Sequence, residues 1–135
     1  MKSIPYVIID IPLHHFCSQE GYKILQFTNG NLKKIANVLY DLRYPKNNFV
    51  DLDNIYENLK IISKVGKPDF FIYNGEEYSF VEFKTQNDNL RKEQVKWLFS
   101  FNEPAIVIHS LNPEEHFTDI MHKLNDNKLC ITQGK

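Results

Sequence analysis

The stretch that decides the expected fold is GKPDFFIYNGEEYSFVEFKTQNDNLRKEQVKW, residues 66–97. Its two apolar runs flank the residues NGEE, and Asn-Gly between apolar runs is the strongest short-range signal for a β-hairpin. Asp88 is a typical N-cap residue, so we expect a helix over about 89–101. The apolar run 105–109 then predicts a short strand covered on both faces. This ββαβ order predicts a hairpin followed by a helix that crosses over to a parallel strand.

The residues before this stretch predict two further strands and a first long helix. Residues 5–11 are β-branched and apolar, and residues 22–27 alternate, so both read as strands. Residues 31–42 have apolar side chains at helical spacing, and Tyr44-Pro45 stops the pattern. Together with the hairpin, these elements predict an α/β sandwich built on a mixed sheet.

Two segments leave alternatives open. Asp51 or Asp53 could cap a short helix through Leu59, and residues 59–63 could either end that helix or start a strand. After the strand at 105–109, Asn112 and Pro113 have the pattern of a helix start. Residues 128–132 could form a last short strand.

The composition limits the possible partners and locations. The formal net charge is -1, so a nucleic-acid partner has to be attracted by a local patch. Arg43 and Arg91 are the two arginines, which leaves most phosphate contacts to lysine. The first apolar run is too short for a signal peptide or a membrane span, and the two cysteines lack the spacing of a zinc site. We therefore expect a soluble, cytoplasmic protein without a membrane partner.

The hairpin brings two carboxylates to one face. Side chains alternate along a strand, so Glu82 and Lys84 share a face with Phe80. A two-residue turn would place Asp69 opposite Phe80, whereas a four-residue loop over 74–77 would place it opposite Glu82. In either register the two carboxylates share a face, with Cβ atoms within roughly 4.5–8 Å.

Two carboxylates this close repel each other unless a positive charge lies near them. Lys84 could supply that charge as a salt bridge, but a divalent cation would do so better. Mg²⁺ prefers oxygen ligands, typically one or two carboxylates with water completing the shell. A metal at this position could polarise a phosphodiester and activate water, with Lys84 orienting or deprotonating that water or neutralising charge on the phosphate.

Gln94 is a separate indication of a site. At 100° per residue it falls in the middle of the apolar stripe of the helix expected over 89–101, which Leu90, Trp97, Leu98 and Phe101 define. A glutamine there faces the sheet, and a buried amide needs a hydrogen-bond partner. The strand that carries Glu82 is the nearest source of one.

These residues resemble a known pattern. G-x-P-D, a short loop, apolar-x-E-x-K-T, D-x-L and Q-x-x-W together are similar to the PD-(D/E)XK nuclease superfamily, and more narrowly to its virus-type replication-repair nuclease (VRR-NUC) domains. The match runs from Gly66 to the strand that ends near His109. The matching residues are Gly66, Pro68, Asp69, Glu82, Lys84, Leu90, Gln94 and Trp97.

The resemblance implies a restriction-endonuclease-like three-layer fold and a Mg²⁺- or Mn²⁺-dependent deoxyribonuclease. Asp69, Glu82 and the backbone carbonyl of Phe83 would be metal ligands, Lys84 the catalytic lysine and Gln94 an active-site residue. Residues 1–135 would form one nuclease-like domain, with 1–45 as N-terminal strands and first helix and 66–109 as catalytic core. Stand-alone domains of this type are commonly homodimers that act on branched DNA such as Holliday junctions.

The sequence departs from this pattern in its first half. Relatives often place a metal-binding Glu on the first core helix, but residues 31–42 contain no Glu. Glu57 or Glu20 could substitute. Near the site, Lys33, Lys34, Lys64 and Lys67 are candidates for DNA contacts, together with Lys60, although lysines on a solvated face look the same.

Two alternatives to the nuclease remain open. The chain could be a catalytically weak or inactive nuclease-like module that binds DNA or a protein partner. It could also be a structural domain in which Lys84 pairs with the two acids and no metal binds.

Overall fold

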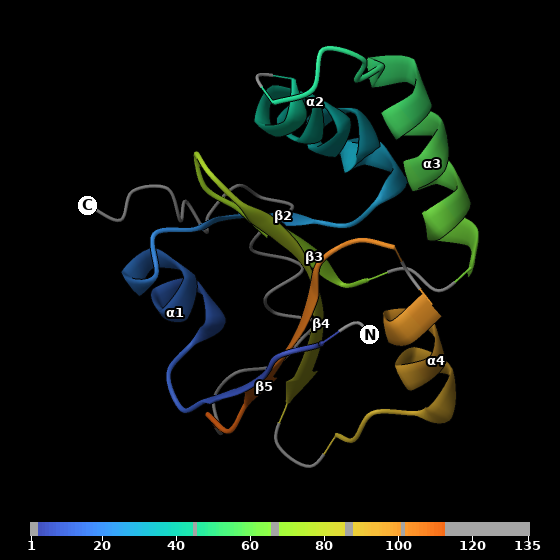
Figure 1. Ribbon diagram of the computed structural model, residues 1–135. Coiled ribbons are helices and arrows are strands. Elements are labelled where there is room, and N and C mark those ends of the chain that lie inside the picture. The colour runs from blue at the N-terminus through green and yellow to red at the C-terminus, as the bar shows by residue number, and fades with distance from the viewer. Residues whose placement is uncertain (1–2, 45, 66–67, 86–87, 101, 113–135) are drawn as a thin grey trace.

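The computed structural model describes residues 3–44, 46–65, 68–85, 88–100 and 102–112. Within these ranges lies a five-stranded sheet in the order β1-β5-β4-β3-β2 (Figure 1). The strands are β1 (Tyr6–Ile9), β2 (Lys23–Gln26), β3 (Phe70–Tyr73), β4 (Tyr78–Thr85) and β5 (Ala105–Ser110). The helix expected to begin at Asn112 and the strand expected at 128–132 lie outside the described residues.

The strand directions confirm the mixed sheet. β5 runs parallel to both β1 and β4, whereas β2, β3 and β4 pair antiparallel in sequence. β3 and β4 are the expected hairpin, and the helix between β4 and β5 is the expected crossover. Both strands predicted at 5–11 and 22–27 are present, each shortened to four residues.

In the described ranges, four α-helices accompany the sheet, namely α1 (Leu13–Gln19), α2 (Leu32–Arg43), α3 (Leu52–Val65) and α4 (Lys92–Ser100), and a short 3-10 helix, η1 (Asn29–Asn31), precedes α2. The sequence did not predict α1, because two buried residues in seven give no recognisable period. α3 continues to Val65, so residues 59–63 are helix and not strand. None of the helices in the described ranges is long and apolar enough to cross a bilayer.

The helices form a layer on each side of the sheet (Figure 1). α1 packs on the face that carries Phe70, Val81 and Phe83. The opposite face carries Phe71 and Phe80, which α2 and α3 cover. α4 packs on β5 through a third cluster, made by Trp97, Leu98, Ala105 and Val107 with Ile4 and Leu90. The α/β three-layer arrangement expected from the sequence is therefore the observed one.

Arg43 ties the end of α2 to the sheet. Its Nη2 donates to both carboxylate oxygens of Glu103 at 2.8 Å and to the hydroxyl of Tyr78 at 2.9 Å. The Tyr78 hydroxyl in turn donates to Glu103 at 2.7 Å. A charge-assisted network of this kind fixes geometry as well as adding stability. It joins the start of β4 to the connection before β5, and so holds the crossover against the α2–α3 layer.

β4 is longer than its hairpin partner β3, so the last residues of β4 have no strand residue of β3 opposite them. This gap in the pairing is the open position at which the candidate site lies. β3 pairs with β4 only as far as Val81, whereas β5 pairs with β4 through Thr85. The last residues of β4 therefore have β5 on one side and the residues before β3 on the other. Pro68 lies there and lacks the N–H that would continue the ladder.

Candidate functional site

The hairpin loop sets which residues meet at this open position. Asn74 accepts the N–H groups of Glu76 and Glu77 on its Oδ1, at 2.8 and 2.9 Å, and closes a four-residue loop. The strand pairs then run from Tyr73–Tyr78 to Phe70–Val81. The next residue on each strand is Asp69 and Glu82. The four-residue alternative is thus confirmed.

Asp69 is anchored through its backbone and its side chain. Its N–H donates to Val81 O at 2.9 Å, and its carbonyl accepts from the N–H of Phe27 at 3.0 Å. Its Oδ2 accepts the backbone N–H of Phe83 at 2.8 Å, which takes the place of a ladder bond beyond the end of β3. The carboxyl groups of Asp69 and Glu82 also lie close enough for the charge of Asp69 to raise the pKa of Glu82. The position of Asp69 is therefore fixed by its N–H, its carbonyl and its carboxylate.

Glu82 is almost completely buried, with an exposed fraction of 2%. Burial and the adjacent charge of Asp69 raise the pKa of Glu82 to about 7. Burial also raises the pKa of Asp69, although the Phe83 N–H and Lys84 oppose this effect. Close carboxylates that cannot both ionise cheaply share a proton, and here Glu82 is the group that holds it near neutral pH. A cation between them would displace that proton.

Lys84 supplies the positive charge of the site. Its side chain is 3% exposed, and its Nζ lies 3.5 Å from Glu82 Oε2 and 3.7 Å from Asp88 Oδ2. Asp88 was predicted to cap α4, but that prediction is wrong. α4 begins at Lys92, and Arg91 is the N-cap because its carbonyl accepts the N–H of Val95. Asp88 instead adds a third, half-exposed carboxylate on the outer side of Lys84.

Gln94 joins α4 to the carboxylate pair, as the apolar stripe predicted. Its Oε1 accepts the N–H of Arg91 at 2.9 Å, and its Nε2 donates to Glu82 Oε2 at 2.7 Å. The first bond is the reach of a residue at the third helical position back to the N-cap. Because that bond uses the carbonyl oxygen, the NH₂ group has to face Glu82. One side chain therefore fixes both the helix start and the orientation of the buried carboxylate.

The backbone of Phe83 borders the same position. Adjacent residues of a strand point their N–H and C=O groups to alternate sides, and both groups of one residue point to the same side. Since the Phe83 N–H faces Asp69, its carbonyl oxygen is also directed to that side. The carbonyl expected as a metal ligand is thus on the correct side of β4.

The structure does not bring every candidate residue to this cluster. Glu57 lies on the exposed side of α3 and pairs with Lys60 at 3.2 Å, and Glu20 is exposed at the end of α1. In the described part of the chain, no three His, Cys, Asp or Glu side chains are grouped so that they could hold a metal. Among the described residues, Glu57 is therefore not grouped with Asp69 and Glu82.

The candidate DNA-binding lysines lie outside the carboxylate cluster. Lys33 and Lys34 are exposed in the first turn of α2, and Lys64 is exposed in the last turn of α3. Lys67 lies outside the described residues. Since α3 leads directly to Pro68 and Asp69, Lys64 is the described lysine of this set that is closest in sequence to the site.

Comparisons with known proteins agree with the fold. No protein-family model matches the chain, and no curated protein sequence matches it. The fold is similar to that of a crystal structure of paFAN1 bound to DNA with a one-nucleotide 5′ flap and a gap, with a TM-score of 0.50 and 11% identity. That match covers 84% of this chain and 38% of paFAN1, so the chain spans well under half of the length of that protein.

The raised pKa of Glu82 predicts a pH-dependent stability. The folded state binds this proton more tightly than the unfolded chain, whose pKa is near 4.5. The resulting stabilisation is complete below pH of about 4.5 and is lost as the pH rises through about 7. In metal-free buffer, Glu82→Gln should therefore gain ~1–3 kcal/mol relative to wild type between pH of about 5 and 8, measured by urea unfolding.

The matched control for this prediction is Glu76→Gln, an exposed carboxylate in the hairpin loop. Its free energy of unfolding should keep a constant difference from wild type over the same pH range. Parallel pH profiles for wild type and Glu82→Gln would contradict the shared-proton description of the pair.

Proposed function

We propose that the protein is a metal-dependent nuclease that cleaves DNA phosphodiester bonds. The observation that carries this proposal is the proximity of the half-buried Asp69 carboxyl group to the buried carboxyl group of Glu82, with Lys84 and Gln94 on Glu82. A structural ion pair would need one acid and one base. Here two acids are held together although their mutual repulsion and burial raise the pKa of Glu82, an arrangement that a cation would relieve.

Mg²⁺ or Mn²⁺ fits the residues present. The donors are all oxygens, from Asp69, Glu82 and the carbonyl of Phe83, as hard divalent cations prefer. When bound, such an ion polarises a phosphodiester and lowers the pKa of water, so that a nucleophile is available near neutral pH. Because the described residues offer only two carboxylates at this position, the site supports one ion, with water and the phosphate as the remaining ligands.

Lys84 would act on the phosphate. The Lys84 side chain is almost fully buried, and this holds its Nζ beside Glu82. An ammonium group fixed in a site with little water stabilises developing negative charge more strongly than an ammonium group in bulk water does. We assign it the role of binding a non-bridging oxygen as charge builds up there. Asp88, at 3.7 Å, helps to hold the ammonium in place on the solvent side.

Gln94 would act as a positioning residue. Its Nε2–H bond leaves Glu82 with one orientation, and partners of metal ligands typically change metal affinity or activity by about 10–100-fold. Its other bond, to the Arg91 N–H, makes this orientation depend on the start of α4. The catalytic strand and the crossover helix thereby form one unit.

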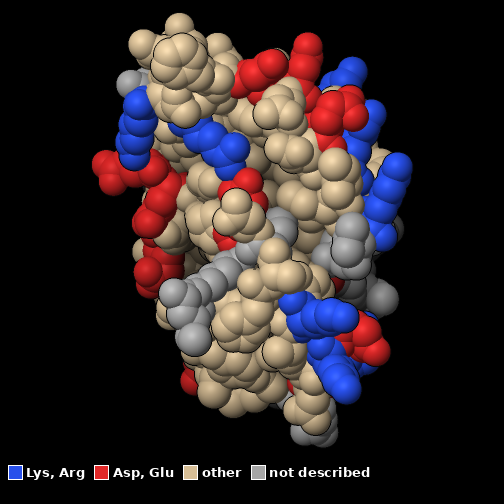
Figure 2. Space-filling view, turned by 45° about the vertical axis from the view of Figure 1, so that its right-hand side comes forward, with Lys and Arg blue, Asp and Glu red and all other residues tan. Residues whose placement is uncertain are grey.

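DNA is the proposed substrate. On the face shown in Figure 2, Lys and Arg side chains are most frequent toward the right-hand side, interspersed with Asp and Glu, while Asp and Glu are more frequent along the left-hand edge, so basic patches exist despite the overall charge of -1. Lys33, Lys34 and Lys64 would contribute phosphate contacts, and such contacts make affinity depend on salt. The similar paFAN1 structure contains flap DNA, which supports this substrate class. Preference for branched DNA and a homodimeric form belong to the same proposal.

A module that binds DNA without cleaving it is the second candidate. The observation that favours it is that, in the described ranges, no third carboxylate is grouped with Asp69 and Glu82 so that it could hold a metal, since Asp88 lies on the outer side of Lys84. If the site binds no more than one ion, the rate of DNA cleavage depends strongly on Lys84 and Gln94. Only the nuclease would release cleaved DNA strands, so the formation of cleavage product distinguishes the two candidates.

The first test is cleavage by ligand variants. Asp69→Asn and Glu82→Gln each remove a charged oxygen ligand and keep the shape of the side chain. Each should reduce cleavage of a duplex or a four-way DNA junction in Mn²⁺ by at least about 100-fold, measured by gel electrophoresis of labelled strands.

Glu93→Gln is the control, since Glu93 is an exposed carboxylate of α4. It should cleave as wild type does. Salt-dependent DNA binding without product from wild type in either metal would favour the second candidate, and full activity of either ligand variant or in excess chelator would overturn the nuclease.

The second test separates the two hydrogen bonds of Gln94. Gln94→Glu keeps an acceptor for the Arg91 N–H but loses the donor to Glu82, whereas Gln94→Ala loses both. Both variants should weaken Mn²⁺ binding by about 10–100-fold in calorimetry, and only Gln94→Ala should destabilise the start of α4. Wild-type Mn²⁺ affinity in Gln94→Glu would show that the amide only caps the helix.

A further inference from the structure

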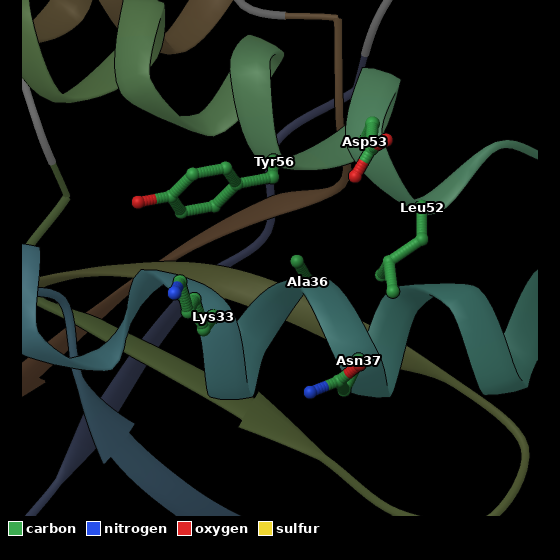
Figure 3. A pocket seen from close by; sticks show the side chains of 6 residues that line it. All are labelled: Lys33, Ala36, Asn37, Leu52, Asp53 and Tyr56. Carbon is green, nitrogen blue, oxygen red and sulfur yellow. The ribbon is translucent and has the colours of Figure 1, made fainter.

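A small pocket lies between α2 and α3, away from the carboxylate cluster. It has a volume of about 140 Å³ and is open to solvent on one side. Its lining residues are Lys33, Ala36, Asn37, Leu52, Asp53 and Tyr56. Figure 3 shows that Tyr56 reaches over α2 with its ring above Lys33, while Leu52 and Asp53 close the other end. Ala36 forms an apolar floor between them.

The pocket has the size of one planar ring. A cavity of about 150 Å³ holds a benzene molecule, so this pocket suits a single-ring group and is too small for a drug-sized ligand. The Tyr56 ring, Ala36 and Leu52 supply apolar contact for the faces of such a ring. Ala36 is 1% exposed, so it lies at the bottom of the pocket. Its methyl group is small, and a larger side chain at this position would fill the space.

The polar groups around this apolar floor differ in sign from end to end. Lys33 lies at the end below Tyr56 and carries the positive charge there. Lys60, one turn further along α3, has its Nζ 5.2 Å from the centre of the Tyr56 ring and pairs with Glu57 at 3.2 Å, so it adds a weaker positive charge to this end. Asp53 lies at the opposite end. Lys33 and Asp53 are too far apart to form a salt bridge, and neither the Asp53 carboxylate nor the Asn37 amide bonds to another described residue. A ligand with a phosphate at one end and an amine at the other matches this polarity.

We infer that this pocket binds one unpaired pyrimidine base of a DNA substrate, with cytosine preferred over thymine. The ring would lie beside Tyr56 on the Ala36–Leu52 floor, its N4 amine would donate to Asp53, and its phosphate would face Lys33 and Lys60. Carboxylates select cytosine in this way, whereas the O4 atom of thymine would be repelled. The inference rests on the proposed DNA substrate and deepens it by naming a contact remote from the cut.

The position of the pocket fits a contact remote from the reacting phosphate. Tyr56 lies nine residues before Val65, which is about 14 Å along the axis of α3. Asp69 follows four residues after Val65. Lys60 and Lys64 occupy the turns of α3 between Tyr56 and the end of the helix, so a strand could keep phosphate contacts from the pocket toward the carboxylate cluster.

The experiment compares DNA hairpins that share one stem and carry an unpaired cytosine, an unpaired thymine or no unpaired base. Binding of the full-length protein is followed by fluorescence anisotropy in chelator, so that cleavage cannot interfere. Wild type should bind the cytosine hairpin about 10-fold more tightly than the paired one, and more tightly than the thymine hairpin. Tyr56→Leu should remove most of this gain, and Asp53→Asn should abolish the preference for cytosine over thymine.

Two matched controls remove the same charges without touching the pocket. Asp51→Asn keeps an N-cap for α3, since Asp51 Oδ1 accepts the N–H of Asp53 at 2.9 Å, and should keep the cytosine preference. Lys34→Gln should weaken binding of all three hairpins equally, whereas Lys33→Gln should reduce the preference for an unpaired base as well.

Several results would overturn the inference. These are equal binding of the three hairpins by wild type, unchanged preferences in both Tyr56→Leu and Asp53→Asn, or binding of free dCMP without any preference among the hairpins. The outcome is independent of catalysis, because Glu82→Gln should retain the cytosine preference. Loss of that preference with intact Mn²⁺-dependent cleavage would reject the pocket alone, and preference without cleavage would reject the nuclease alone.

Discussion

The candidate site depends on one constraint, the enforced proximity of the half-buried Asp69 carboxyl group to the buried carboxyl group of Glu82. Pro68, which would pair next with Phe83, ends the β3 ladder, while β4 continues along β5, and the Asp69 side chain accepts the Phe83 N–H instead. Its carboxylate is therefore placed against Glu82 by backbone geometry. The raised pKa of Glu82, the burial of Lys84 and the orientation of Gln94 all follow from that placement.

The neighbouring elements make this constraint rigid. The Arg43–Glu103–Tyr78 network holds the crossover to the end of α2, and the packing of α4 on β5 brings Gln94 within 2.7 Å of Glu82. Sites held on strands and helices keep their geometry better than sites on loops. The lysines of α2 and α3 lie outside this unit, so the proposed DNA binding and the proposed chemistry at the carboxylates can be tested separately.

Much of this arrangement follows from local patterns in the sequence. Strand alternation put Asp69 and Glu82 on one face for either even-length loop, and the helical period turned Gln94 toward the sheet. The choice of a four-residue loop could not be predicted, because it depends on the Asn74 side chain accepting the N–H groups of Glu76 and Glu77 within the loop. The start of α4 was misjudged because Asp88 has the residue type of a cap, but in three dimensions its carboxylate is near Lys84. Glu57 was a candidate only because nothing in sequence fixed its direction.

The central claim is that Asp69 and Glu82 hold a divalent cation, and Mn²⁺ soaked into crystals tests it most directly through its anomalous scattering. If the site binds the ion, one anomalous peak is expected between the two carboxylates, within coordination distance of the Phe83 carbonyl, with Lys84 Nζ moved away from Glu82. A structure at high Mn²⁺ concentration without a peak there, in which Lys84 keeps its 3.5 Å contact with Glu82, would contradict the account and leave the cluster as a structural charge group.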